Sequence, residues 1–337
     1  MTLRRSLLWA GSAVVTVLLI VVLIKISKLD LRVTVQQLRS VRWLSFAKLV
    51  VLTAVHVFLS TQKWRCVDAA LRRSTDSAPS RTMSFALTSI GVALGQVLPV
   101  QVSMSAARTL GTYLHRRALR RGTGGTLFEQ SFDVLIVGFL AIASGATRVY
   151  RGGGMMWAIC AATMTVFAMI ALGPAVGLIH RQAISLNART IAPRNRVLRA
   201  FGSLEHSGLL SPGLARQLMA LSIARFAVQV LMAAVTAEAI GVRIPLWHLA
   251  AAMPFVIIAC VIIVTPGGLG VNELSYATTL RMFGTPLNVG AQWALSNRVL
   301  VASSCFVVAA CATAVLGLTK VMAAGRQAKA MQEDPPW

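Results

Sequence analysis

Seven charged side chains lie within or beside long apolar runs of the sequence. They are Arg108, Glu129, Asp133, Arg225, Glu238, Glu273 and Arg298. A charge at the depth of a bilayer costs several kcal/mol unless it is paired or hydrated. Arginine binds a phosphate through two parallel hydrogen bonds, and a carboxylate can orient the arginine or meet a cationic group. These residues could therefore bind an amphiphile with a charged headgroup; the alternative is internal ion pairing, for example of Arg225 with Asp133 or Glu238.

A second candidate site is the sequence PGGLGVNE at 266–273, which follows an apolar run. Its residues of interest are Pro266, Gly267, Gly268, Gly270, Asn272 and Glu273. Proline lacks the N–H of a helical residue and glycine adopts positive φ, so a helix should end here and another should begin at 269–272 and run through Leu280. At membrane depth the new helix N-terminus would present its positive end to an anionic group. The alternative is an exit loop at the membrane surface, with Glu273 as a solvated cap.

A matching interruption occurs in the first half of the chain. The apolar segment 84–99 stops at Pro99 and is followed by the more polar segment 100–122. Paired interruptions in two halves are typical of a transporter site. The distribution of Lys and Arg also favours an arrangement in which both interrupted elements return to the side from which they enter, because this concentrates positive charge on the cytoplasmic side.

The composition predicts the elements that must position these residues. Of 337 residues, 56% are hydrophobic, and the mean hydropathy is +0.71. We predict an all-α polytopic transmembrane bundle of about six to eight membrane segments, two of them interrupted. The predicted uninterrupted spans are 7–24, 44–60, 128–144, 155–179, 214–240 and 289–318, with 246–264 leading into the PGG break. Residues 1–320 would form one domain and 321–337 a charged tail, with 62–74 a basic loop and 122–125 a glycine turn.

Several function classes are excluded by the sequence. The formal net charge of +23 suggests nucleic acid, but the basic residues lie in short segments between apolar runs, as expected for loops on an anionic membrane surface. The five cysteines form no CxxC or Cys/His cluster, so we expect neither disulfides nor a metal site. Because no known catalytic or nucleotide-binding motif is present, we predict no enzyme activity, no cofactor and no nucleic-acid partner.

The segment PGGLGVNE, followed by NRVL at 297–300, resembles a motif of the lysylphosphatidylglycerol synthase transmembrane-region family of flippase-like membrane proteins. QKWRCVDAAL at 62–71 resembles the family's arginine-tryptophan segment, with the order reversed to Trp64 then Arg65. FEQSFDVL at 128–135 resembles its Glu-Arg-x-x-Asp helix, with Gln130 in place of the arginine. The family's acidic residue after Pro-Gly is missing at 99–101, and Arg108 is the equivalent arginine. The resemblance covers essentially the whole chain.

The resemblance implies translocation of a lipid between leaflets of the cell inner (plasma) membrane, with an anionic phospholipid or a lipid-linked amphiphile as substrate. Arg108, Arg225 and Arg298 would receive the headgroup, and Glu129, Asp133 and Glu273 would orient them. Bifunctional relatives join this region to an aminoacyl-transferase domain, which this sequence lacks. We therefore expect membrane lipids as partners, together with a separate lipid-modifying enzyme. The alternatives are a membrane-embedded transferase acting on lipid-linked substrates and a non-transporting scaffold.

Overall fold

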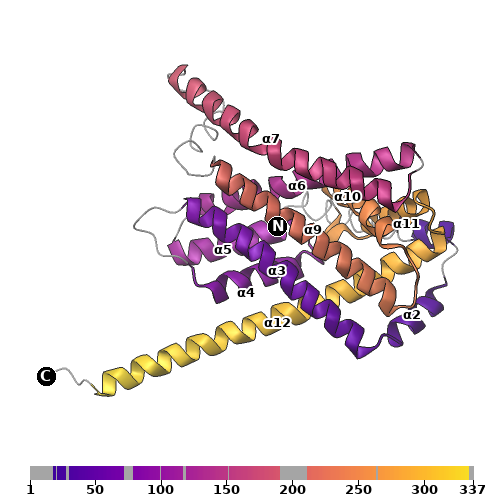
Figure 1. The fold of residues 1–337 in the computed structure, drawn as a ribbon. Helices are drawn as coiled ribbons and strands as arrows, with labels where there is room; N and C mark the ends of the chain where they lie inside the picture. Colours follow the sequence, from indigo (N-terminus) through magenta and orange to yellow (C-terminus); the bar gives the residue numbers. More distant parts are fainter. Residues whose placement is uncertain are drawn as a thin grey trace, which may run out of the picture.

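The protein is helical throughout the residues that its computed structural model describes. These residues are 18–19, 21–27, 30–71, 79–98, 100–116, 119–150, 152–189, 211–262 and 265–333. The elements are α2 (Leu31–Arg39), α3 (Trp43–Leu71), α4 (Arg81–Leu94), α5 (Val100–Arg116), α6 (Leu119–Val149), α7 (Gly154–Arg189), α9 (Pro212–Ala239), α10 (Leu246–Ile262), the 3₁₀ turn η1 (Pro266–Gly268), α11 (Val271–Met282) and α12 (Leu287–Glu333) (Figure 1). The predicted all-α bundle is confirmed.

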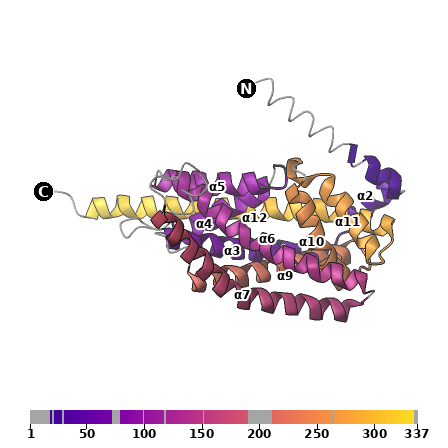
Figure 2. The ribbon, with the colours of Figure 1, turned by 90° about the horizontal axis from the view of Figure 1, so that it is seen from above.

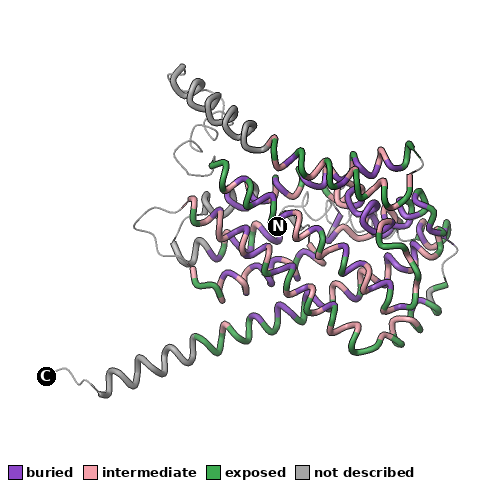
Figure 3. The backbone as a smooth tube through the Cα atoms, viewed as in Figure 1, coloured by how far each residue is buried: buried purple, intermediate pink, exposed green. Residues whose placement is uncertain are grey.

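Five described helices are long and apolar enough to cross a membrane: α3, α6, α7, α9 and α12. α10 is apolar but shorter. In a view turned by 90°, α7 lies at the edge of the bundle, and the C-terminal part of α12 extends beyond the other helices (Figure 2). Exposed positions accumulate on α12 beyond the bundle (Figure 3). The predicted span 7–24 lies mostly outside the described residues, as do Pro99 and residues 334–337 of the predicted tail.

The first interrupted element is a helical hairpin of α4 and α5. A Cβ on Gly91 would touch Met104, and a Cβ on Gly111 would touch Leu87, so the two helices run antiparallel. α4 has 14 residues, which at 1.5 Å per residue span about 21 Å, less than the roughly 30 Å of a hydrocarbon core. The chain therefore turns back before one arm alone could cross.

The second interrupted element is a hairpin of α10 and α11 joined by η1. The rings of Trp247 and Phe283 lie 5.9 Å apart at its open end, while Gly268 lies beside Cys260 near its tip. α11 has 12 residues, about 18 Å, and begins and ends within two residues of the predicted limits. The prediction of two interrupted elements is therefore confirmed.

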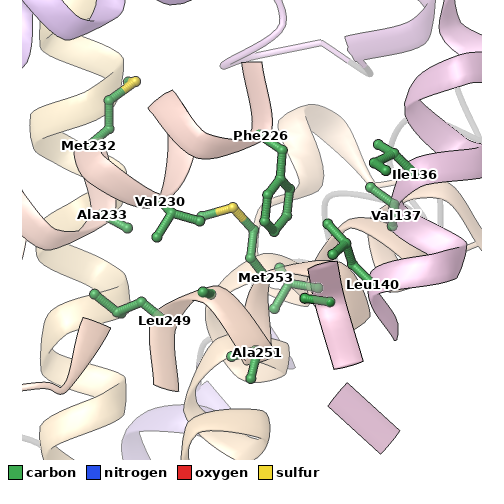
Figure 4. Close-up of a cluster of buried hydrophobic side chains, with 14 of the residues drawn as sticks. Ile136, Val137, Leu140, Phe226, Val230, Met232, Ala233, Leu249, Ala251 and Met253 are labelled. Atoms are coloured by element: carbon green, nitrogen blue, oxygen red, sulfur yellow. The ribbon is translucent and has the colours of Figure 1, made fainter. Parts of the chain in front are cut away.

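The apolar core that holds the hairpins in place lies between α6, α9 and α10. Buried side chains from these helices gather there, among them Leu140, Phe226, Val230 and Met253 (Figure 4). Between membrane helices such contacts stabilise the bundle through close van der Waals packing, because lipid tails are as apolar as these side chains. The core fixes the backbones that carry the charged residues described below.

Two predicted loops are helical instead. Residues 62–71 continue α3 rather than forming a basic loop, and Lys63 is fully buried. The prediction was wrong because a basic amphipathic face looks the same in sequence whether it meets water or buried carboxylates. The glycines at 122–125 lie within α6; a Cβ on Gly125 would press on Leu71 and Val67, so glycine allows close helix packing there rather than a turn.

Candidate functional site

Arg108 and Glu129 form an ion pair that is completely enclosed by the bundle. Arg108 of α5 donates from Nη1 to Glu129 Oε2 of α6. Its Nη2 donates to the backbone O and the Oγ of Ser60 on α3, at 3.0 and 3.1 Å. The Arg108 guanidinium also lies over the Trp64 ring, 5.4 Å from its centroid, in a cation–π contact. Arg108 thus ties α3, α5 and α6 together.

Asp133 lies one turn beyond Glu129 on α6 and joins two further cations. Its Oδ1 accepts from Lys63 Nζ and its Oδ2 from Arg225 Nη1, both at 2.6 Å. Lys63 Nζ also donates to the backbone O of Glu129 at 3.3 Å, which connects this group to the Arg108 pair. Of the two internal pairings considered as the alternative to a ligand site, that of Arg225 with Asp133 is present.

We call these five residues, Lys63, Arg108, Glu129, Asp133 and Arg225, the central ion cluster. It holds three cations and two carboxylates, so one positive charge is in excess. The Lys63 and Arg108 side chains are fully buried, while those of Asp133 and Arg225 are 21% and 20% exposed. An unbalanced charge in a low-dielectric interior attracts an anion strongly. The cluster is open at its Arg225 end.

The tips of the two hairpins meet at Arg298 of α12. Arg298 Nη2 donates to the backbone O of Gln96, just after α4, and to that of Gly267 in η1 at 2.6 Å. Gly267, Gly268 and Gly270 all have positive φ, so the turn depends on glycine. Helix ends leave carbonyl groups without intrahelical partners. Arg298 gives one such carbonyl oxygen at each of the two interruptions a hydrogen-bond donor, with a single guanidinium.

Glu273 caps the restarted helix from inside. Its Oε2 accepts from Gly270 N at 2.6 Å, and Oε1 lies 3.9 Å from Arg298 Nε. The side chain is 2% exposed, so Glu273 is a buried cap rather than the solvated cap of the surface-loop alternative. We call the segment from Thr265 to Glu273, together with Gln96, Asn297 and Arg298, the hairpin junction.

Several oxygens around the junction are buried and have no hydrogen-bond partner among the described residues. They are Thr265 Oγ1, Asn272 Oδ1, Glu273 Oε1 and Asn297 Oδ1. All are hydrogen-bond acceptors, and all belong to the chain around η1 or to the turn of α12 that carries Arg298. The junction therefore leaves buried oxygens that can accept a hydrogen bond without a described donor.

Glu238 belongs to neither group. It lies at the end of α9, 64% exposed, and pairs across 3.5 Å with Lys48, which is 49% exposed. Among the described residues Glu238 thus pairs with Lys48 and not with Arg225, and its depth in the membrane stays a prediction. No described group of three or more His, Cys, Asp or Glu is placed to hold a metal ion.

The family follows from comparison of the whole chain. The lysylphosphatidylglycerol synthase TM region family matches residues 8–309. This chain belongs to that family. Neither the curated proteins nor the solved structures that were compared match the chain. The protein is thus a multi-pass membrane protein of the lysylphosphatidylglycerol synthase TM region family, a family related to lipid modification or flipping.

In this family member, the predicted site residues divide into two groups. Arg108, Glu129, Asp133 and Arg225 lie in the central ion cluster, whereas the PGG segment, Glu273 and Arg298 form the junction. Among the described residues, the polar contacts of Arg298 are to Gln96, Gly267 and Glu273 and not to the central ion cluster.

Sequence reasoning missed Lys63, Ser60 and Gln96 as members of these groups. For Lys63 a signal was available, since it lies in the QKWRCVDAAL segment that resembles the family's pattern. Ser60 and Gln96 contribute backbone oxygens, which no sequence pattern marks.

Proposed function

We propose that the protein moves a lipid with an anionic headgroup between the leaflets of the cell inner membrane and leaves the lipid chemically unchanged. The observation that carries this proposal is the excess positive charge of the central ion cluster, enclosed by helices long enough to span a bilayer. A headgroup phosphate with one negative charge would balance the cluster. Such a binding site at membrane depth lowers the cost of carrying the charged headgroup across.

Arg225 is the residue placed to receive the phosphate. Its guanidinium uses Nη1 on Asp133 and lies at the open end of the cluster. Lys63 also holds Asp133, so Asp133 stays paired when Arg225 turns to a phosphate. Arg108 is occupied with Glu129 and Ser60 and acts as a positioning residue for α6.

The test is scrambling of headgroup-labelled phosphatidylglycerol in liposomes that contain the purified protein. We expect Arg225→Gln to slow translocation about ten- to one-hundredfold, because a hydrogen bond to a charged group contributes about 1.5–3 kcal/mol. Arg225→Lys should keep part of the rate, since a point charge replaces a bidentate donor. Lys48→Ala is the control variant, because it removes an ion pair with Glu238, which lies on α9 as Arg225 does but at the exposed surface.

Other outcomes would replace this proposal. If no anionic, aminoacylated or polyprenyl lipid crosses faster than in protein-free liposomes, the protein is better explained as a scaffold for a separate lipid-modifying enzyme. If the labelled lipid is recovered chemically altered, a transferase is the better explanation. Equal rates for Arg225→Gln and the Lys48→Ala control would remove the central ion cluster from the site.

A further inference from the structure

The hairpin junction contains a set of buried oxygens that the lipid proposal does not use. Thr265 Oγ1, Asn272 Oδ1, Glu273 Oε1 and Asn297 Oδ1 each have no hydrogen-bond partner among the described residues. Thr265 and Glu273 are 4% and 2% exposed. A buried polar atom without a partner costs about 1–3 kcal/mol, and more when it is charged. Three of these oxygens around one turn, and a fourth on the adjoining part of α12, form a set of possible ligands for a bound species.

The oxygens belong to segments that the structure holds together. Gly268 N donates to Thr265 O at 3.0 Å, which closes the turn, and Asn272 and Glu273 begin the helix that follows. Arg298 lies against the same turn, 2.6 Å from Gly267 O and 3.9 Å from Glu273 Oε1. Asn297 is its neighbour in α12. The turn and the helix that carries Arg298 thus supply all four atoms.

The chemistry of these atoms indicates which kind of species they could bind. They are carboxylate, amide and hydroxyl oxygens, the ligands that hard cations prefer. Arg298 Nη2 is committed to the carbonyl oxygens of Gln96 and Gly267, and no hydrogen bond joins Arg298 to Glu273 Oε1. Arg298 already balances the charge of the one carboxylate, so a monovalent cation would add one net positive charge and a divalent cation two, which favours the monovalent ion.

We propose that the hairpin junction binds an alkali cation of the size of sodium, through the oxygens of Thr265, Asn272, Glu273 and Asn297. An interrupted helix is a place where membrane transporters bind such ions, because unwound backbone and helix ends expose oxygens there. The cation would give these oxygens a common partner and link η1 to α12. This proposal revises the expectation that the chain has no metal site.

The experiment is equilibrium binding of radioactive sodium to the purified full-length protein in detergent, at constant ionic strength set with choline chloride. We expect saturable binding that unlabelled NaCl displaces and choline chloride does not. Thr265→Val keeps the shape of the side chain and removes the oxygen, and should weaken binding at least about tenfold. Glu273→Gln should abolish it. Ser84→Ala is the matched control, because Ser84 Oγ is also buried without a partner but lies in the first turn of α4.

Thermal unfolding provides a second measurement if Glu273→Gln folds poorly. NaCl should raise the Tm of the unaltered protein and of Ser84→Ala above the value in choline chloride, and Thr265→Val should lose that increment. If Thr265→Val instead raises Tm equally in both salts, the oxygen is merely unsatisfied and the site is overturned. Sodium binding that is absent, unaffected by Thr265→Val, or replaced by a purely pH-dependent shift in Tm would also overturn it.

The cation-site proposal and the lipid proposal are tested by independent experiments. Sodium binding is measured without translocated lipid, and its variants lie in the hairpin junction. Translocation is tested through Arg225, which belongs to the central ion cluster. Loss of one result therefore leaves the other standing.

Discussion

The central ion cluster and the hairpin junction are both buried and both built around arginine, yet they are unbalanced in opposite ways. In the cluster every carboxylate oxygen named above has a cationic donor, and one positive charge remains in excess. In the junction the formal charges of Glu273 and Arg298 cancel, but acceptor oxygens remain without donors. The cluster is therefore suited to an anion, and the junction to a cation or a donor.

The difference also separates two uses of arginine inside a membrane. Arg225 is bound to a carboxylate at an open edge, where a phosphate can compete for it. Arg298 is bound to two backbone carbonyls that the interrupted helices leave unpaired, so its loss changes the backbone itself. The same residue type binds a ligand in one place and completes main-chain hydrogen bonding in the other.

The largest effect should come from breaking the enclosed pair in the cluster. Glu129→Ala leaves Arg108 fully buried without its carboxylate, which should lower the free energy of unfolding by about 3–5 kcal/mol. Reversible unfolding in mixed micelles measures it. If Glu129→Ala lowered the free energy of unfolding by less than about 1 kcal/mol, water or another group would reach Arg108. The Arg108 pair would then not be more enclosed than the Arg225 end of the cluster.

Removing the guanidinium from the junction should cost somewhat less. Arg298→Ala leaves the carbonyls of Gln96 and Gly267 without their donor, and we expect a loss of about 2–4 kcal/mol, because each hydrogen bond to a charged group contributes about 1.5–3 kcal/mol. The same unfolding assay applies. Arg298→Lys is the control that keeps the charge; full recovery by lysine would mean that charge, rather than the bridge between the hairpins, is what matters.

Adding a methyl group at either of two neighbouring glycines of the turn tests whether the tips of the two hairpins meet. Both Gly267 and Gly268 have positive φ, but a Cβ on Gly267 would overlap Gln96 O and Arg298 Nη2, whereas one on Gly268 would make ordinary contacts. Gly267→Ala should therefore be less stable than Gly268→Ala by about 1–3 kcal/mol. Equal stabilities would indicate that the tips of the two hairpins do not meet.

The smallest effect should come from the surface pair. Lys48→Ala removes an exposed ion pair between α3 and α9 and should change the free energy of unfolding by less than about 1 kcal/mol, an effect that salt reduces further. Unfolding at low and high NaCl checks it. A larger loss would mean that burial does not decide how much an ion pair contributes to the free energy of unfolding in this protein.

The sequence was sufficient for features that depend on local chemistry. Pro266 and its glycines predicted the break and the start of α11, and the cost of isolated charge in a membrane raised internal pairing of Arg225, with Asp133 as one of two candidate partners, as an alternative. The joining of Gln96 O to Gly267 O through Arg298 could not be predicted, because backbone oxygens are the same in every residue and the contact is distant in sequence. Lys63 was missed because the basic stretch of α3 in which it lies has the same sequence pattern as a basic helix face that contacts water. The substrate-binding roles of these residues stay predictions.

The length of α12 separates the junction from the end of the helix that projects. The helix runs unbroken for 47 residues, about 70 Å, and its second half leaves the bundle (Figure 1). Arg298 lies about a quarter of the way along this rod. Side chains of α12 are buried on both sides of Arg298, from Ala291 to Ala312. The bundle therefore holds the first half of the helix, and the side chain that joins the hairpins lies within this held half and not on the projecting part.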